Sequence, residues 1–241
     1  EGADPDEVIH LACELGDLKI VRKLLNSGAE PSIRSWKWHD TPLHRACVFG
    51  HASVVKELLQ FKAPVNIRNS NCWMTPLEEA ITFEYIECVR LLIDAGALVN
   101  EINWNYHSTP LLEACSKGNY EIVKLLLDSH ANPNLNVGVY PLYKAVCYPK
   151  IVQLLLERGA KVDCSNDAFP EKGDYPLHQA SMMGCVESVK LLLNAGADPK
   201  MENIRCETPL DRAKWQLGYN LTTPCNPPEM TTHIIDRKSV V

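Results

Sequence analysis

A short motif recurs along the 241-residue chain at nearly constant spacing, and this recurrence restricts the possible folds more than any other feature. Each copy carries Thr-Pro-Leu or Tyr-Pro-Leu, with the prolines at Pro42, Pro76, Pro110, Pro141, Pro176 and Pro209. The successive intervals between these prolines are 34, 34, 31, 35 and 33 residues. A second landmark closes each unit: Gly28-Ala29, Lys62-Ala63, Gly96-Ala97, His130-Ala131, Gly159-Ala160 and Gly196-Ala197. Two landmarks that keep one period indicate a repeat array, in which each unit buries its apolar face by stacking on its neighbours.

The residues within one unit predict two short helices. Thr41 is a suitable N-cap, and Pro42 fits the first helical position, where its missing N–H is not needed. Gly50 is placed to end this helix, because glycine tolerates a positive φ. Residues 54–59 then carry valine and leucine at the spacing of an amphipathic helix.

The motif resembles the ankyrin repeat, which runs Thr-Pro-Leu-His-x-Ala, a glycine turn, an apolar helix and a Gly-Ala ending. The resemblance covers residues 5 to 217 and implies an all-α solenoid of stacked ankyrin helix-turn-helix repeats with β-hairpin-like fingers between them. We expect one ankyrin-repeat domain over residues 1–217, with repeats near 5–37, 38–71, 72–105, 106–137, 138–171 and 172–204 and a partial seventh repeat at 205–217 as a cap. Residues 218–241 carry three prolines and no apolar periodicity, which predicts a flexible C-terminal tail.

Three features depart from the pattern. Glu84 stands where a turn glycine is expected, so we expect a distorted turn in repeat three. Repeat five is shorter between its helices, and Pro149 must end its first helix early. The loop from Cys164 to Asp174 is longer than its equivalents, and insertions in repeat arrays tend to project from one face.

Charge and cysteine usage exclude several classes of protein. The formal net charge is −6, whereas proteins that bind nucleic acid normally carry a basic stripe, so we expect no nucleic-acid partner. No stretch approaches the ~20 apolar residues that cross a bilayer, so we expect no membrane insertion. The ten cysteines show no zinc-site spacing, and Cys13, Cys47 and Cys115 each follow an alanine at a place where a small apolar residue is wanted. Free thiols favour a reducing compartment, which means the cytoplasm or the nucleus.

The sequence carries no enzyme motif: a Gly-rich phosphate loop, His-Glu-x-x-His and Gly-x-Ser-x-Gly are all absent. His10, His44 and His178 occupy one place in the repeat. A histidine at that place in the ankyrin motif helps to hold adjacent loops, so the resemblance implies a structural role for these three. We therefore predict no enzyme, no cofactor and no metal site.

Ankyrin proteins resemble one another in binding partners on a concave side made of finger tips and first helices. At the place just before the helix turn, this chain has mostly large apolar residues: Leu15, Phe49, Phe83, Tyr148 and Met183, with Lys117 in repeat four. The fingers add Trp36, Trp38, His39, Trp73, Trp104, Tyr106 and His107. Aromatic residues and methionine are enriched at interface centres, although any one ring can instead pack on a neighbouring finger.

We therefore predict a scaffold or adaptor whose concave groove binds an extended peptide or a short helix with apolar anchors. Five basic residues lie near the expected groove and are expected to pair with acidic residues of the ligand: Lys37, Arg45, Arg68, Lys117 and Lys144.

Three further possibilities stay open. Residues 109–115 and 141–145 resemble ankyrin proteins with a SOCS box, which implies an alternative function as the substrate-recognition subunit of a ubiquitin ligase with the box outside this chain. Asn66, Asn100 and Asn134 each follow a leucine by eight residues, which fits the ankyrin substrates of asparagine hydroxylases. The last residues, Ser239-Val240-Val241, resemble a ligand for PDZ domains.

Overall fold

The computed structural model describes residues 5–36, 39–167 and 173–216. Within these ranges the regular elements are all helices, and none of them is long and apolar enough to cross a membrane. The chain divides into two compact units, Glu1–Val137 and Gly138–Val241, called unit 1 and unit 2 below. The expectation of a single domain over residues 1–217 stays a prediction, and the tail at 218–241 lies outside the described residues.

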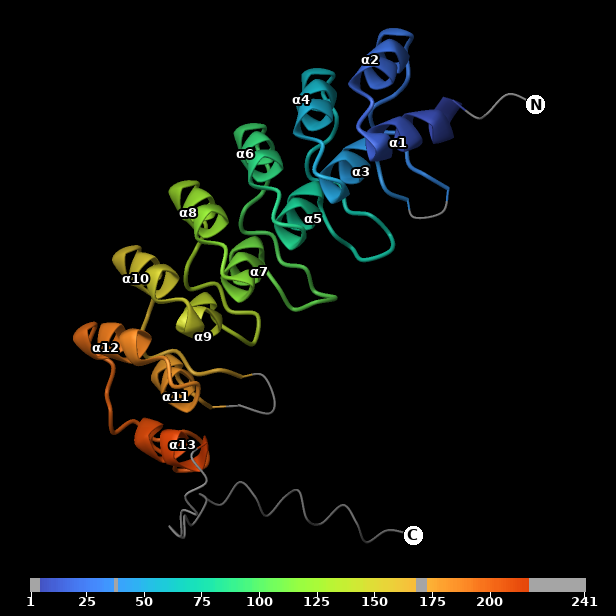
Figure 1. The fold of residues 1–241 in the computed structure, drawn as a ribbon. Coiled ribbons are helices and arrows are strands. Elements are labelled where there is room, and N and C mark those ends of the chain that lie inside the picture. The colour runs from blue at the N-terminus through green and yellow to red at the C-terminus, as the bar shows by residue number, and fades with distance from the viewer. Residues whose placement is uncertain (1–4, 37–38, 168–172, 217–241) are drawn as a thin grey trace, which may run out of the picture. The chain divides into compact units, whose positions relative to one another are not determined.

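Unit 1 consists of four helix pairs. They are α1 (Pro5–Leu15) with α2 (Leu18–Asn26), α3 (Pro42–Val48) with α4 (Ala52–Gln60), α5 (Pro76–Thr82) with α6 (Ile86–Asp94), and α7 (Pro110–Lys117) with α8 (Tyr120–Asp128). The first helices α1, α3, α5 and α7 pack side by side in one layer, and the second helices form another (Figure 1). The stacked helix-turn-helix array that the repeat spacing predicts is confirmed.

Unit 2 continues the same pattern with one short repeat. Its elements are α9 (Pro141–Lys144), a 3-10 helix η1 (Ala145–Cys147), α10 (Pro149–Glu157), α11 (Pro176–Met182), α12 (Val186–Asn194) and α13 (Pro209–Gln216). The first helices α9, α11 and α13 pack in succession, and α10 packs against α12. Pro149 takes the first position of α10, and the first helix of repeat five ends at Lys144 in a 3-10 turn. The early end of that helix is confirmed.

The threonine-proline motif starts the first helices as the sequence predicts. The Thr75 hydroxyl accepts a hydrogen bond from the N–H of Glu78 at 3.3 Å, and Thr109 does the same for Leu112 at 3.1 Å. Proline occupies the position after each of these caps. The caps satisfy N–H groups that have no partner inside the helix.

The turn between the two helices of a repeat uses a left-handed residue, at φ 72° in Gly50. Glu84 takes the same conformation, with φ 61°, and the hydrogen bonds of its turn are retained, including Tyr85 N–H to the Ala80 carbonyl at 2.9 Å. The expectation of a distorted turn at Glu84 is therefore wrong. The backbone keeps the turn and accepts the unfavourable φ, because moving one turn would disturb the stacking of a whole repeat.

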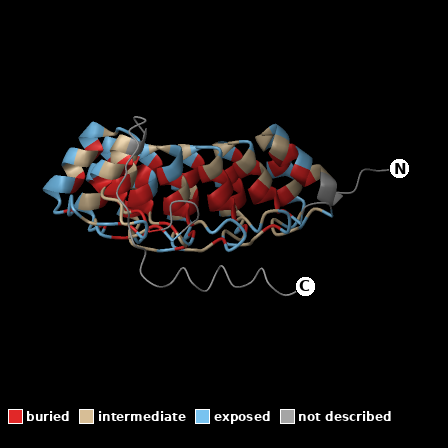
Figure 2. Ribbon diagram, turned by 90° about the horizontal axis from the view of Figure 1, so that it is seen from below, coloured by how far each residue is buried: buried red, intermediate tan, exposed pale blue. Residues whose placement is uncertain are grey.

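The core of each unit lies where its helices face one another. Figure 2 shows buried residues along the inner sides of the helices and exposed residues at the fingers. The fully buried side chains include Leu43, Leu58, Leu77, Leu92 and Leu111 in unit 1 and Leu142, Ile151 and Leu155 in unit 2. These are the apolar positions of the repeat.

The cysteines mostly serve this core. Cys13, Cys47 and Cys115 are fully buried, and burial raises the pKa of Cys13 to about 12. Eight of the described cysteines are free thiols, but Cys206 is disulfide-bonded. The interpretation of the cysteines as free thiols is thus confirmed for eight and wrong for Cys206.

The repeated histidines join one repeat to the next. His10, His44 and His178 donate from Nε2 to the carbonyls of Asp40, Met74 and Glu207 at 3.1, 3.2 and 2.9 Å. In His44 the Nδ1 atom accepts the Thr41 N–H at 3.1 Å, so the ring is neutral with its proton on Nε2. Burial lowers the pKa of His44 to about 4, which keeps it neutral. The structural role predicted for this position is confirmed by these bonds.

Candidate partner-binding surface

The fingers are the loops that connect one repeat to the next. Five of them are closed by a backbone hydrogen bond. These bonds run from Ser35 N–H to Asp40 O, Asn69 to Met74 and Asn103 to Ser108 in unit 1, at 2.9 Å each, and from Asn166 to Asp174 and Asn203 to Glu207 in unit 2, at 2.7 and 3.0 Å. The return bond from Ser108 N–H to Asn103 O, at 3.1 Å, gives that finger a two-residue β-bridge. The β-hairpin-like fingers expected from the sequence therefore reduce to tight turns with one such bridge in the described ranges.

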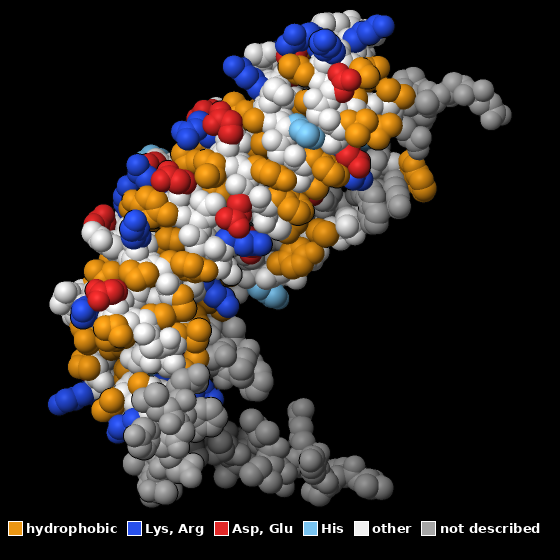
Figure 3. Space-filling model, viewed as in Figure 1, with side chains coloured by type: hydrophobic (Ala, Val, Ile, Leu, Met, Phe, Trp, Pro, Cys, Tyr) orange, Lys and Arg blue, Asp and Glu red, His pale blue; other side chains and the backbone are white. Residues whose placement is uncertain are grey.

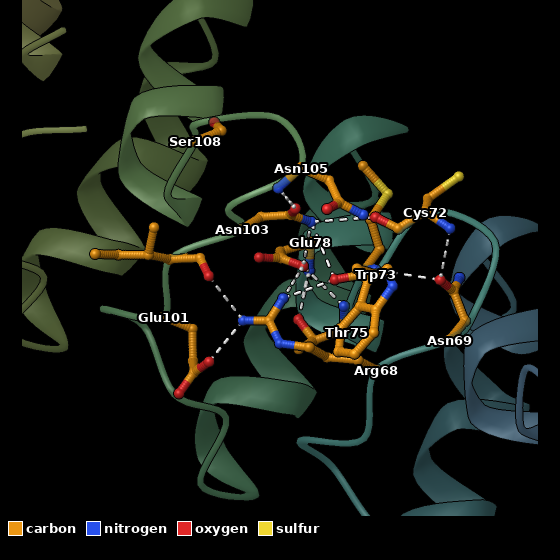
Figure 4. A network of polar contacts seen from close by, with 12 residues as sticks. Arg68, Asn69, Cys72, Trp73, Thr75, Glu78, Glu101, Asn103, Asn105 and Ser108 are labelled. Carbon is orange, nitrogen blue, oxygen red and sulfur yellow. Dashed lines mark hydrogen bonds and ion pairs between the residues drawn. The ribbon is translucent and has the colours of Figure 1, made fainter. Parts of the chain in front are cut away.

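Arginines link neighbouring fingers of unit 1. Arg68 donates to the Trp73 carbonyl at 2.6 Å in its own finger and to the Ile102 carbonyl at 3.1 Å in the next (Figure 4). It also forms an ion pair with Glu101 at 2.6 Å. Arg34 reaches the Arg68 carbonyl at 3.3 Å from the preceding finger. The three fingers are thus held in fixed positions before any partner binds, which reduces the ordering cost of binding.

Buried asparagines add to these links. Asn103 is buried and donates through Nδ2 to the Trp73 carbonyl at 3.0 Å. Asn69, one repeat earlier, donates to Glu79 at 2.8 Å and accepts the N–H of Met74 at 3.2 Å. The carbonyl of Trp73 therefore has two donors, and the finger tip that carries this tryptophan is rigidly fixed (Figure 4).

Finger tips of unit 1 hold large side chains in a left-handed conformation. His39, Trp73 and His107 lie two residues before the N-cap threonine of the next helix, at φ 50°, 53° and 46°. In unit 2 the same place is taken by Gly138, Gly173 and Cys206. A side chain other than glycine costs about 1–2 kcal/mol in this region, and such strain often marks a functional position.

The predicted finger aromatics lie at the surface. Trp36, Trp73, Trp104 and Tyr106 have exposed fractions from 54% for Tyr106 to 75% for Trp36. These exposed fractions show that none of the four rings packs fully on a neighbouring finger. His39 is also exposed, and Trp38 lies outside the described residues.

The apolar residues of the helix turns form a second row in unit 1. Phe49 stacks on His51 and Phe83 on Tyr85, with ring centroids 6.4 and 6.3 Å apart. The Tyr85 ring in turn lies directly over Gly50 of the preceding repeat, so that a Cβ there would be 2.5 Å from the ring. Phe49 and Phe83 are partly exposed, and they are linked because Phe83 stacks on Tyr85, which covers Gly50 next to Phe49. Apolar side chains gather over α3 and α5 in Figure 3.

A cleft connects finger and helix residues in unit 1. It measures about 20 Å³ and is lined by Met74, Glu78, Thr82, Asn103, Tyr106, Ser108, Thr109, Pro110 and Glu113. This volume is far below that of small-molecule pockets and corresponds to about one water molecule, so the cleft is a shallow depression of the surface. The Tyr106 hydroxyl also forms a hydrogen bond with the Cys72 thiol of the preceding finger, and this hydrogen bond raises the pKa of Tyr106.

The wall of this cleft contains a buried acid. Glu78 replaces the histidine of other repeats; its Oε2 accepts the Thr75 N–H at 2.8 Å, but its buried Oε1 has no hydrogen-bond partner in the described structure. Burial raises the pKa of Glu78, and this effect exceeds the lowering of the pKa by the hydrogen bond from the Thr75 N–H and by the positive charge of Arg68. Neighbouring Glu79 is also buried, and burial raises its pKa well above the ordinary value. The repeat pattern does not indicate that these two acids lie inside the array.

The basic residues near the surface are largely neutralised. Arg45 pairs with Asp40 at 2.5 Å and with Glu14 at 3.6 Å, and Lys117 pairs with Glu113 at 3.8 Å. Arg68 pairs with Glu101 as described above, and Lys144 is exposed. Lys37 lies outside the described residues. Acidic residues of a ligand would compete with these partners for Arg45, Arg68 and Lys117, and pairing with a ligand stays a prediction.

In unit 2 the predicted residues lie at the corresponding turns. Tyr148 and Met183 are exposed, and each directly follows the first helix or 3-10 turn of its repeat. They form a separate candidate surface on unit 2.

The candidate hydroxylation sites have structural roles of their own. Asn66 donates to the Gly96 carbonyl at 3.2 Å and accepts the Leu98 N–H at 3.0 Å. Asn100 repeats this arrangement with His130 and Asn132 at 3.1 and 2.7 Å. Asn134 is half-buried. The side-chain amides of Asn66 and Asn100 thus bind the next repeat through both their nitrogen and their oxygen. Hydroxylation of these asparagines stays a prediction.

Comparison with known proteins identifies the repeat. The family model described as ankyrin repeats (3 copies) matches residues 9–103 and 111–203. The chain belongs to the ankyrin-repeat family. The same match and the stacked helix pairs confirm the all-α ankyrin solenoid predicted from the sequence.

Two solved ankyrin domains are similar over nearly the whole chain. The human ASB11 ankyrin repeat domain has a TM-score of 0.73 and 29% identity, and the match covers 90% of this chain and 99% of that one. The ankyrin repeat domain of Bcl-3, a member of the IkappaB family, has a TM-score of 0.74 and 30% identity, covering 91% and 100%. The ASB11 match agrees with the weaker resemblance to SOCS-box ankyrin proteins.

A curated relative is similar over one part only. The BTB/POZ domain and ankyrin repeat-containing protein NPR5 of Oryza sativa subsp. japonica is 42% identical over 65 residues. These residues are 27% of this chain and 12% of the rice protein. The similarity therefore concerns the ankyrin repeats of a much longer protein.

Proposed function

We propose that the chain is a protein-interaction module whose unit 1 binds an apolar segment of another protein through Phe49, Phe83 and the finger aromatics Trp36, Trp73, Trp104 and Tyr106. Ankyrin repeats bind protein partners, which supports the general class. The specific surface is supported by exposed rings on fingers that Arg68 and Asn103 hold in place. Aromatic anchors on a rigid frame are typical of the energetic centres of interfaces.

One observation supports this proposal most strongly: Trp73 keeps a large ring at a left-handed finger tip where glycine would avoid the strain. A side chain retained against a conformational cost of about 1 kcal/mol is expected to make a contact that the free chain does not show. The shallow apolar cleft beside Tyr106 adjoins this finger tip. The occupant we expect is an extended peptide or a short helix with apolar anchors.

The test is a quantitative pull-down that compares the chain with a Phe49→Asp/Phe83→Asp variant. The matched control is Ile20→Asp/Leu98→Asp, which places the same charges on exposed apolar residues of α2 and of the loop after α6. All three proteins must first show the same thermal unfolding by circular dichroism. We expect specific partners to be lost with the Phe49/Phe83 variant and retained with the control.

Binding measured with the purified partner then completes the test. Replacing a true aromatic anchor is expected to lower affinity about 30-fold, which corresponds to about 2 kcal/mol. Equal retention of partners by the folded Phe49/Phe83 variant and the control would show that this surface is not the binding site.

A second function is favoured by the similarity to the ASB11 domain over nearly its entire length. In this alternative the repeats hold the substrate of a ubiquitin ligase, and another segment of the protein recruits the ligase. The measurement is ligase activity co-purifying with the full-length protein from cells. If the full-length protein still binds its partner but no ligase activity co-purifies with it, the ubiquitin-ligase alternative is refuted and the function is that of an interaction module.

We further propose that the module is not itself an enzyme, binds no nucleic acid and acts in the cytoplasm or nucleus. The interspersed charge with a net value of −6 and the eight free thiols support this view, while the Cys206 disulfide does not. Localisation of the tagged full-length protein in cells tests the compartment. The PDZ-like terminus Ser239-Val240-Val241 lies outside the described residues and stays a prediction.

A further inference from the structure

Two thiols of unit 2 lie unusually close to each other. The Sγ atoms of Cys147 and Cys185 are 3.3 Å apart, and both residues are free thiols. Cys147 is exposed at the end of η1, and Cys185 is half-buried at the N-cap of α12. The pair is therefore accessible to reagents, unlike the cysteines of the core.

The place of Cys185 in the repeat explains the contact. Cys185 lies ten residues after Tyr175, as His51, Tyr85 and Asn119 lie ten residues after Thr41, Thr75 and Thr109. At each of these places the side chain bridges to the helix turn of the preceding repeat. His51 donates to the Glu14 carbonyl at 2.8 Å, and Asn119 donates to Glu84 at 2.9 Å. In unit 2 the equivalent bridge consists of two thiols.

The short turn of repeat five supplies the second thiol. Because Pro149 starts α10 directly after Tyr148, the turn has no glycine, and the 3-10 helix η1 ends on Cys147 at the position that faces repeat six. The irregularity of this repeat thus brings Cys147 against Cys185. Neither cysteine belongs to the buried alanine-cysteine series of Cys13, Cys47 and Cys115.

We propose that Cys147 and Cys185 form an oxidative modification site, in which a small-molecule disulfide such as glutathione disulfide converts the two thiols into an intramolecular disulfide between repeats five and six. This inference does not depend on the proposed function.

The reaction balances in two exchange steps. One cysteine, as its thiolate, attacks a sulfur of glutathione disulfide, forms a mixed disulfide and releases one glutathione thiolate. The second cysteine then attacks the protein sulfur of that mixed disulfide and releases the second glutathione. The two cysteines lose two electrons and two protons, and glutathione disulfide is reduced to two glutathione molecules. The sulfurs must close from 3.3 Å to the bonded distance of about 2.05 Å.

The surroundings indicate the order of the two steps. Burial and the hydrogen bond to Cys147 raise the pKa of Cys185 to about 11. Cys185 is therefore mostly protonated near neutral pH, and the more exposed Cys147 is the thiol that meets the reagent first. Cys185 then resolves the mixed disulfide. The rate of closure is expected to rise with pH, because the thiolate is the attacking species.

The bond would act on the surface of unit 2 that carries Tyr148 and Met183. Tyr148 directly follows Cys147, and Met183 lies two residues before Cys185. A covalent link there fixes the turn between η1 and α10 against α12, and cross-links stabilise the folded chain mainly by restricting the unfolded one.

The experiment exposes the full 241-residue chain to glutathione redox buffers at pH 8, followed by acid quenching, alkylation with N-ethylmaleimide and peptide mapping by mass spectrometry. Folded wild-type chain is expected to give a linked peptide pair containing Cys147 and Cys185, and a melting temperature several degrees higher than that of the reduced chain. The Cys147→Ser and Cys185→Ser variants are each expected to lack this peptide pair. Cys185→Ser should instead accumulate glutathione on Cys147.

The matched control is Cys72→Ser, which removes a half-buried thiol from a finger of unit 1 and should leave the linked pair unchanged. Separate glutathione adducts on Cys147 and Cys185 without a linked pair would overturn the proposal. So would a linked pair that forms only after the chain is unfolded in urea.

Discussion

Replacing Trp73 by glycine and by alanine separates two effects of this side chain. The ring is 56% exposed, so its removal uncovers roughly 100 Å² of apolar contact, which is worth about 2 kcal/mol as an upper estimate. Both variants lose that contact. Only glycine also relieves the left-handed conformation at φ 53°, since alanine still carries a Cβ.

The difference between the two variants therefore measures the strain. The left-handed region costs a non-glycine residue about 1–2 kcal/mol, and the greater flexibility of unfolded glycine offsets up to about 1 kcal/mol of the gain. We expect Trp73→Gly to have a free energy of unfolding about 1 kcal/mol higher than Trp73→Ala. Urea denaturation followed by far-ultraviolet circular dichroism measures this without depending on the tryptophan that is removed.

Trp104 provides the matched control, because it is similarly exposed, at 67%, but has no positive φ. At Trp104 glycine should be less stable than alanine by about 0.5–1 kcal/mol, the reverse of the order at Trp73. The same order at both positions would refute the strain at the finger tip. With a purified partner in hand, both Trp73 variants should bind more weakly than wild type, and unchanged affinity would remove Trp73 from the proposed surface.

Two further substitutions test features that the repeat pattern conceals. Glu84→Gly should raise the free energy of unfolding by about 1 kcal/mol in urea denaturation, because glycine accepts φ 61°, and no gain would mean that the hydrogen bond from Asn119 offsets the strain. Glu79→Gln should stabilise the chain by about 1–3 kcal/mol at pH 8 but little at pH 4, with the hydrogen bond from Asn69 retained. Burial raises the pKa of Glu79 in the folded state, so below the ordinary value of 4.5 the carboxyl is neutral in both the folded and the unfolded chain. As the pH rises above 4.5, the carboxyl ionises more readily in the unfolded chain, and the wild-type chain loses stability. Equal stabilisation by Glu79→Gln at pH 4 and pH 8 would contradict this pH dependence.

The sequence predicts the regular part of this fold well, because that part depends on local chemistry repeated many times. Thr75 and Pro76 define a helix start by capping and by the absence of an N–H, whatever the neighbouring repeat contains. The role of His44 follows from the same repetition, since a residue that recurs at one place in stacked units meets the same partner each time.

The sequence could not predict which departures from the pattern the array absorbs. Glu84 looked like a broken turn, but the stacked repeats impose the turn on it. Glu78 and Glu79 face the fingers from their helix, and there Asn69 donates to Glu79 and Asn103 to Glu78. Charge alone does not show burial, because burial here comes from the neighbouring repeat rather than from the helix itself.

The candidate surface was predictable in its residue types but not in its geometry. Exposed aromatic residues can be read from their places in the fingers and turns, and Phe83 is an example. That the finger residue two places before the N-cap is left-handed at Trp73 depends on backbone bonds that no side-chain pattern encodes. The contact of Cys147 with Cys185 had a detectable signal, since Cys185 occupies the bridging place in its repeat, but it required the shortened turn of repeat five to be placed in space.

Several violations of local preference fall together in repeat three. Trp73 and Glu84 hold positive φ values, as His39 and Lys62 do in repeat two and His107 and His130 in repeat four. Repeat three adds two buried acids, Glu78 and Glu79, each with one carboxylate oxygen lacking a hydrogen-bond partner in the described structure. Natural sequences agree with their fold at most positions and tend to break local rules at functional sites. The cleft beside Glu78 and the exposed ring of Phe83 belong to this same repeat. The proposed binding surface is therefore expected to have its energetic centre on repeat three, rather than to extend evenly along unit 1.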